Sequence, residues 1–199
     1  PAFSVGRTQS IVHVLCKLAK KGLLPPVKVF VDSPLAIKST HVYSKHPELL
    51  NDEAAAFLKE HGDLFDFEGL KWIDNLDRHE QVTNYTDSCI IISAAGMVEG
   101  GRIQEHVKNN IQNPFSTILI AGFCAEGTLG HRLLSGQNTI GIKGKDYRIY
   151  SKVARTEVFS SHPDFILKTH HPFQEFQQML ANEGINNVEI PEMGDEFLI

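Results

Sequence analysis

The sequence is poor in several features that mark particular classes of protein. Acidic residues outnumber basic ones, and the formal charge of −5 over 199 residues means that no overall positive field draws the chain toward nucleic acid. No apolar run approaches the length of a membrane span, and no signal peptide, repeat or low-complexity tract is visible. The 42% of hydrophobic residues suffices for one buried core, or for one domain and part of another.

Cysteine is also scarce. The three cysteines, Cys16, Cys89 and Cys124, lie in apolar segments at wide and irregular spacing. This pattern favours buried free thiols in a reducing compartment over a disulfide, and we therefore expect a cytoplasmic protein. The first residues, "PAFSVGRTQS", include no methionine. We expect them to come from the interior of a longer protein, with part of its active site upstream of Pro1.

Hydrophobic patterns predict an α/β fold. Continuous β-branched runs at 27–32, 88–93 and 116–122 are typical of buried parallel strands. Helical spacing or capping residues predict helices at 7–22, from Ser33 and Pro34 onward, at 51–62, in "GGRIQEHVKNN" and at 173–183, while "NTIGIKG", "YRIYSKV" and "VEIP" predict further strands. Alternating strands and helices indicate a Rossmann-like, mostly parallel sheet with flanking helices. The polar, aromatic-rich segment 63–87 fits no element clearly.

Glycine-rich turns follow two of the predicted strands. Gly96, Gly100 and Gly101 in "SAAGMVEGGR" run straight into a helix, where the backbone can approach a phosphate and Arg102 can add a bidentate contact. The turn is neither G-x-G-x-x-G nor a P-loop. A tight strand-to-helix turn without a ligand is the simpler interpretation of this stretch alone.

The segment "EGTLGHR" repeats this arrangement, with Gly127 and Thr128 before a helix start and Arg132 within it. Ligands of an open parallel sheet bind at the carboxyl ends of its strands. Two such turns at neighbouring strand ends favour an extended phosphodiester track.

Three histidines lie close together in "FSSHPDFILKTHH". His162 follows a Ser-Ser pair, and an apolar, strand-like run leads to His170 and His171. Imidazole binds metals and carries protons near neutral pH, so this cluster is a candidate site, although adjacent histidines are also common in polar loops. The scattered histidines are expected to be structural or solvated: His13, His41, His46, His61, His79 and His106.

Five motifs occur in a fixed order: "PAFSVGRTQ", "VDSPLA", "SAAGMVEGGRIQEHV", "GFCAEGTLGHRLLSG" and "FSSHPD". Together they resemble the β-CASP branch of the metallo-β-lactamase superfamily, which contains RNA-processing nucleases. The resemblance implies that residues 1–157 form the β-CASP domain and that 158–199 return the chain into the metallo-β-lactamase half. The rest of that half, with most ligands for two zinc ions, would lie N-terminal to Pro1.

The resemblance also implies roles for single residues. His162 matches a histidine that resembles a general acid, and His170 matches a zinc-ligating or zinc-bridging position, with His171 as a close competitor. Histidine at this position favours RNA over DNA. Two features differ from the family pattern. Only seven residues separate His162 from His170, and His131 stands in "GTLGH" where the family has arginine, so that the arginine here, Arg132, comes one position later.

The expected function follows from these matches. The chain would be the RNA-binding and active-site-closing part of a zinc-dependent nuclease, inactive alone, with RNA and the metallo-β-lactamase half as partners and no membrane. A homodimer is left open. Two rival interpretations are a non-catalytic pseudo-nuclease scaffold or RNA-binding module of the same fold and a Rossmann-like nucleotide-binding domain.

Overall fold

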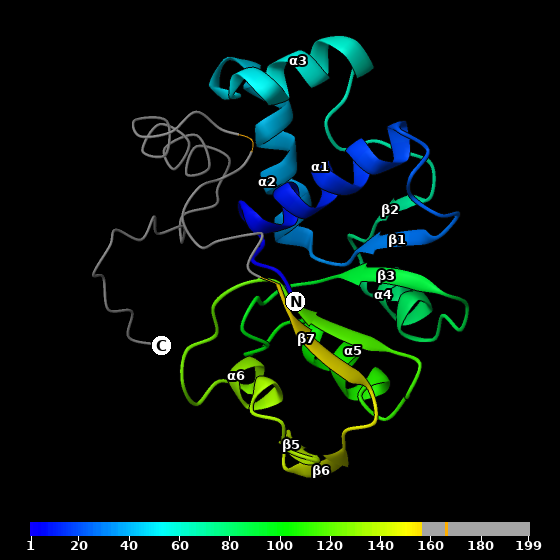
Figure 1. The fold of residues 1–199 in the computed structure, drawn as a ribbon, viewed down its shortest axis with the longest axis vertical. Coiled ribbons are helices and arrows are strands. Elements are labelled where there is room, and N and C mark those ends of the chain that lie inside the picture. The colour runs from blue at the N-terminus through cyan, green and yellow to red at the C-terminus, as the bar shows by residue number, and fades with distance from the viewer. Residues whose placement is uncertain (157–165, 167–199) are drawn as a thin grey trace.

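A computed structural model describes residues 1–156 and 166 of the chain, and the elements below belong to that part (Figure 1). The helices are α1 (Arg7–Lys20), α2 (Pro34–Lys45), a short 3-10 turn (Pro47–Leu49), α3 (Asp52–His61), α4 (Leu76–Thr83), α5 (Ile103–Asn110) and α6 (Leu129–Leu134). The strands are β1 (Lys28–Val31), β2 (Leu70–Trp72), β3 (Cys89–Ile92), β4 (Thr117–Ile120), β5 (Thr139–Ile142), β6 (Lys145–Arg148) and β7 (Lys152–Arg155).

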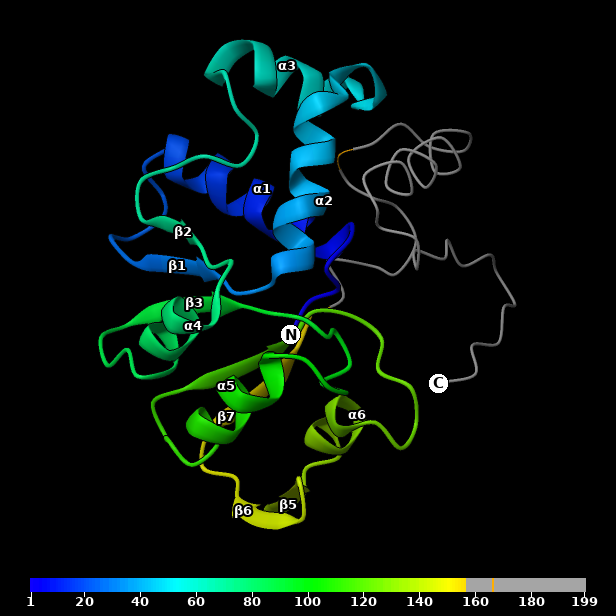
Figure 2. The same ribbon diagram turned by 180° about the vertical axis from the view of Figure 1, so that it is seen from behind.

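Parallel strands form the centre of the fold. β1 lies between β2 and β3, and all three run in the same direction, with Val29 opposite both Leu70 and Ile90. β4 and β7 form a second parallel pair, and β5 and β6 form an antiparallel hairpin. Figures 1 and 2 show α1, α2 and α3 on the β2–β1–β3 side, and the hairpin at the other end. The predicted α/β class with a mostly parallel sheet and flanking helices is confirmed.

Local chemistry explains where the first elements begin and end. Helix α1 is closed by Gly22 at φ +67, whose N–H donates to the carbonyl of Ala19 (2.9 Å), while the N–H of Leu23 donates to Leu18 (2.9 Å). Helix α2 is capped by Ser33, whose side chain accepts a hydrogen bond from the N–H of Ala36. Both boundaries agree with the predicted helix stop and helix start.

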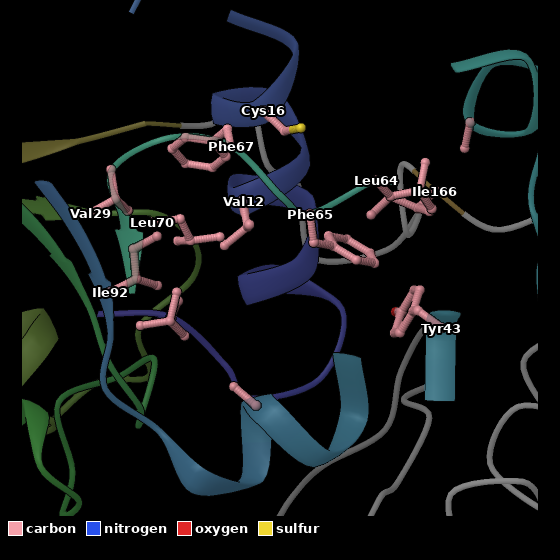
Figure 3. Close-up of a cluster of buried hydrophobic side chains, with 14 of the residues drawn as sticks. Val12, Cys16, Val29, Tyr43, Leu64, Phe65, Phe67, Leu70, Ile92 and Ile166 are labelled. Carbon is pink, nitrogen blue, oxygen red and sulfur yellow. The ribbon is translucent and has the colours of Figure 1, made fainter. Parts of the chain in front are cut away.

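Two apolar clusters hold these elements together. The larger one packs α1 and α2 onto the β2–β1–β3 sheet and includes Val12, Val29, Tyr43 and Leu70 (Figure 3). The second joins β4, α6 and the β5–β6 hairpin through Ile120, Leu129, Leu133 and Ile140, among others. Strand β1 is buried at Phe30 and at both its valines, as expected of a central strand.

Two parts of the predicted element order are corrected. "YRIYSKV" is not one strand but spans parts of β6 and β7, because the N–H groups of Tyr150 and Ser151 both turn to the carbonyl of Ile111 (3.0 Å each). The unassigned segment 63–87 contains β2 and α4. The helix predicted at 173–183 and the strand "VEIP" lie outside the described residues.

The three cysteines are free thiols, as expected, with Cys16 and Cys124 buried and Cys89 only partly buried. The reducing compartment stays a prediction. Burial raises the pKa of each thiol, so these cysteines are predominantly protonated at neutral pH. Among the described helices, none has both the length and the apolar character needed to cross a membrane.

Candidate functional site

The carboxyl ends of β1 and β3 meet at one edge of the sheet. The N–H of Asp32 donates to the carbonyl of Ile92 (2.8 Å), and the hydroxyl of Ser93 donates to the carbonyl of Asp32 (2.8 Å). Because β2 and β3 lie on opposite sides of β1, the direction of the strand order reverses between β1 and β3. Open α/β sheets bind ligands in the crevice at such a reversal point.

The segment that precedes α1 packs onto the same edge. The N–H of Ala2 donates to the carbonyl of Ser93 (2.9 Å), and the hydroxyls of Ser4 and Ser33 lie 3.1 Å apart. The buried amide of Gln9 then ties this segment to α2, because its Nε2 lies within hydrogen-bond distance of the carbonyl of Ser4 and of three oxygens of α2. The motifs "PAFSVGRTQ", "VDSPLA" and "SAAG" therefore share one edge.

The two glycine-rich turns contact each other at this edge. The N–H of Gly130 donates to the carbonyl of Met97 (2.8 Å), and the carboxylate of Glu99 accepts a hydrogen bond from the N–H of Leu129. A Cβ on Gly130 would lie 2.5 Å from the sulfur of Cys124 and 2.7 Å from the carbonyl oxygen of Met97. The structure thus brings the two turns into contact, although β3 and β4, which they follow, belong to separate sheets.

The glycines of the turns serve different purposes. Gly100 and Gly127 adopt φ values of +77 and +87, and a Cβ on either would meet nothing within 4 Å. A Cβ on Gly96 would lie 2.9 Å from the ring of Phe3, and one on Gly101 only 2.4 Å from the carbonyl oxygen of Ala94. The backbone is therefore open to a ligand at Gly100 and Gly127, and closely packed at Gly96 and Gly101.

This difference predicts unequal effects of two adjacent substitutions. We expect Gly101→Ala to lower the free energy of unfolding by about 2–5 kcal/mol, because its methyl group overlaps a backbone carbonyl in addition to the left-handed φ. Gly100→Ala carries only the conformational cost of about 1–2 kcal/mol. Urea unfolding of both variants measures the difference. Equal losses would show that the close approach of Gly101 to Ala94 does not constrain the turn.

A buried carboxylate organises the floor of the site. The side chain of Asp32 is fully buried, and its Oδ1 accepts a hydrogen bond from Nη1 of Arg102 (2.7 Å). Its Oδ2 accepts from Nδ1 of His79 (2.5 Å) and from Nε2 of His106 (2.6 Å). Arg102 also donates to the carbonyl of Ile73 at the end of β2 (3.3 Å). Strands β1 and β2 and helices α4 and α5 are joined at this point.

The hydrogen-bond partners of Asp32 stabilise its ionised form. Burial would by itself raise the pKa of this carboxyl, but the hydrogen bonds from His106, Arg102 and His79 outweigh burial and lower the pKa to about 2. The carboxylate is therefore ionised at neutral pH. The guanidinium of Arg102 balances its charge, and only 18% of that side chain is exposed.

Among the described residues, Asp32, His79 and His106 form a group that could hold a metal ion, since one possible ligand atom from each lies within 4.8 Å of the others. The short N···O distances, however, are those of hydrogen bonds to the carboxylate. A divalent cation would have to displace both imidazole N–H donors and lie beside the Arg102 guanidinium. The group therefore fits a structural hydrogen-bond network better than a resident metal.

The other predicted contacts also point inward. The side chain of Thr128 caps α6, accepting from the N–H of His131 (3.2 Å) and donating to the carbonyl of Ala125 (2.6 Å). Arg132 donates to the carbonyl of Gly141 in β5 (3.4 Å). Phosphate contacts by Thr128, Arg132 and Arg102 remain predictions, and the turns offer open backbone at Gly100 and Gly127. His162, His170 and His171 lie outside the described residues.

A comparison with known protein families matches residues 8–133 to the Beta-Casp domain. The chain belongs to this family. The matched region includes α1 except Arg7, the Asp32 network and both glycine-rich turns, while the segment before α1 lies outside it. The predicted boundary after residue 157 lies beyond the matched region and stays a prediction.

The curated relatives of the chain carry the names of transcription termination factors, of a ribonuclease and of an RNase J-like protein. The Beta-Casp chain is 31% identical to "Transcription termination factor FttA" of Methanosarcina mazei over 170 residues, 82% of this chain and 26% of that protein. It is 30% identical to "RNase J-like protein" of Methanocaldococcus jannaschii, over 83% of this chain and 37% of that protein. "Ribonuclease TTHA0252" of Thermus thermophilus is 24% identical over 81% of this chain and 37% of its own length. The chain thus spans only a quarter to two fifths of these relatives.

Sequence reasoning assigned no shared role to the residues around Asp32. His79 and His106 were each expected to be structural or solvated, and within the network they are structural. One signal was present: Arg102 and His106 are four residues apart, which places both on the same face of α5. His79 could not be placed because α4 was not predicted.

Proposed function

We propose that this Beta-Casp chain is the RNA-binding and active-site-closing part of a zinc-dependent ribonuclease that hydrolyses phosphodiester bonds. The observation that carries the proposal is the convergence of four motif segments on the carboxyl edge of β1 and β3. Two of these segments present open backbone at Gly100 and Gly127. Family membership and two relatives named as RNases support RNA as the substrate.

The division of labour within the site follows from the contacts. Backbone N–H groups around Gly100 would meet the phosphates, because a helix start with an open glycine before it favours an anion. At the second turn the N–H groups of Leu129, Gly130 and His131 already donate to Glu99, Met97 and Thr128, so a phosphate would approach the backbone at Gly127 instead. The Asp32 network would hold the first turn rigid through Arg102. Zinc would be supplied by a metallo-β-lactamase half, with His170 or His171 of this chain as one ligand and His162 as the general acid.

The remaining partners are part of the same proposal. The protein would act on RNA in the cytoplasm. The metallo-β-lactamase half would face the shared edge from the side on which the RNA binds. A homodimer is compatible with this arrangement. A second candidate is a non-catalytic RNA-binding module. The relatives named transcription termination factors favour it, since that name describes an effect on transcription and not a hydrolysis.

The two candidates differ in zinc-dependent cleavage. We expect this chain alone to bind a labelled RNA without cleaving it and to bind zinc weakly, because a catalytic zinc usually has three protein ligands and the chain carries one or two candidates. The protein that joins it to a metallo-β-lactamase half should cleave RNA and lose this activity on chelation. Gel assays of cleavage and calorimetry with zinc measure both properties.

Either of two results would contradict the proposal. Cleavage by the isolated chain with tight stoichiometric zinc would mean that the metal centre lies within it. RNA binding without cleavage by the joined, zinc-loaded protein would favour the non-catalytic module.

A further inference from the structure

Two aromatic side chains stand exposed at the amino ends of β4 and β7. Phe115 is 96% exposed and Tyr150 is 53% exposed. Their backbones come together where the strands begin, because the N–H of Lys152 donates to the carbonyl of Ser116 (3.0 Å). Figure 1 shows these ends turned away from the chain's amino terminus, which lies near the carboxyl ends of both strands.

The turns that carry these rings are fixed by hydrogen bonds. The N–H of Phe115 donates to the side chain of Asn113 (3.0 Å), and the N–H of Ser116 donates to the carbonyl of Asn113 (3.1 Å). On the other side, the N–H of Tyr150 donates to the carbonyl of Ile111 (3.0 Å). Both aromatic residues are therefore held on ordered backbone while their rings face solvent.

The two stretches that carry the rings contain basic residues and no acidic ones. No aspartate or glutamate occurs in 106–125 or in 147–156, although acidic residues outnumber basic ones in the whole chain and the exposed Asp146 directly precedes the second stretch. Arg148 and Lys152 are exposed on either side of Tyr150. A purely apolar patch would suit a protein partner, whereas exposed aromatic rings next to exposed cations suit a polyanion that carries flat groups.

We propose that Phe115, Tyr150, Arg148 and Lys152 form a platform for single-stranded RNA. Bases stack on the two rings, and the two cations contact the phosphates between them, which gives affinity without sequence preference. This proposal rests on the proposed function and adds a second binding site at the opposite end of β4 and β7 from the glycine-rich turns. A four-residue strand measures about 13 Å, so an RNA of several nucleotides would reach both sites.

The test measures binding of this 199-residue chain to RNAs of about 4 and about 16 nucleotides, a range typical of such surfaces. Phe115→Ala and Tyr150→Ala should each weaken binding of the longer RNA by about 5- to 150-fold, and Tyr150→Phe should restore it. Lys152→Ala should lower the magnitude of the salt slope by about 0.7. Leu23→Ala and Lys20→Ala remove an exposed apolar residue and an exposed cation from the other end of the molecule and should change neither quantity.

The outcomes separate this proposal from the one on which it rests. If the wild-type chain binds the longer RNA and Phe115→Ala, Tyr150→Ala and Lys152→Ala all bind it equally well, the platform is refuted and the carboxyl edge remains the RNA site. A wild-type chain that binds no RNA contradicts the proposed function as well. An unchanged salt slope with weaker binding by the aromatic variants would show an apolar contact and overturn the assignment of Lys152. Because Phe115 is almost fully exposed, its substitution leaves folding intact.

Discussion

Asp32→Asn is expected to lower the free energy of unfolding by about 3–5 kcal/mol at neutral pH. The amide keeps the shape of the side chain but removes the negative charge on which three donors converge. The guanidinium of Arg102 would then be mostly buried with no carboxylate partner, and an amide oxygen cannot accept all the hydrogen bonds made by His79 and His106. Urea unfolding of wild type and variant at neutral pH measures the loss.

The same substitution makes a pH-dependent prediction. The pKa of Asp32 in the folded chain is about 2, below the ordinary value of 3.8 that applies to the unfolded chain. Because the pKa of Asp32 is lower in the folded chain, ionised Asp32 stabilises the fold fully at pH values above the pKa of the unfolded chain. This stabilisation is lost as the pH falls to the pKa of the folded chain. The stability difference between wild type and Asp32→Asn should therefore shrink between about pH 4 and pH 2, where a protonated aspartate becomes similar to asparagine.

An exposed ion pair provides the control. Asp74 lies 3.7 Å from Arg78, and both side chains are more than half exposed. Asp74→Asn should change the free energy of unfolding by at most about 0.5 kcal/mol, because water and salt screen such a pair. Equal losses at Asp32 and Asp74 would show that the buried network does not stabilise the fold. A difference that stayed constant between pH 4 and pH 2 would contradict the lowered pKa of Asp32.

Features fixed by local chemistry could be predicted from the sequence. The runs that became β1, β3 and β4 are rich in β-branched residues and shorter than a typical helix, and Ser33 and Gly22 are residue types that favour helix caps. The meeting of the motifs that follow β1 and β3 also followed, because parallel strands place their carboxyl ends on the same side. These predictions needed no knowledge of distant contacts.

Features that depend on distant partners could not be predicted. The break between β6 and β7 arises because the N–H groups of Tyr150 and Ser151 donate to the carbonyl of Ile111. Ile111 is distant in the sequence, and nothing in "RIYSK" indicates this contact. Likewise, Arg102 follows a glycine pair at a helix start and was interpreted as a phosphate ligand. Its ion pair with Asp32, which directly follows β1, could not be predicted because the two residues are far apart in the sequence. The phosphate contact of Arg102 stays a prediction.

His162→Ala is expected to lower turnover by about 10²–10⁴-fold in the protein that joins this chain to its metallo-β-lactamase half, while zinc content stays near that of the wild type. We propose His162 as the general acid that protonates the leaving oxygen, and a general acid assists proton transfer without holding the metal. His170→Ala should reduce zinc occupancy as well as rate, because a ligand fixes the ion. Metal analysis and steady-state cleavage of a labelled RNA measure the two properties separately.

A change of leaving group distinguishes these roles further. A substrate whose leaving oxygen is much more acidic needs less protonation, so it should restore part of the activity of His162→Ala and none of that of His170→Ala. His171→Ala tests the neighbouring candidate: loss of zinc in this variant alone would move the ligand by one position. His61→Ala is a suitable control, since His61 ends α3 and lies against Phe57, away from the glycine-rich turns. Full activity and full zinc content in both His162→Ala and His170→Ala would refute the proposed roles, because neither proton transfer nor metal binding would then depend on the two imidazoles.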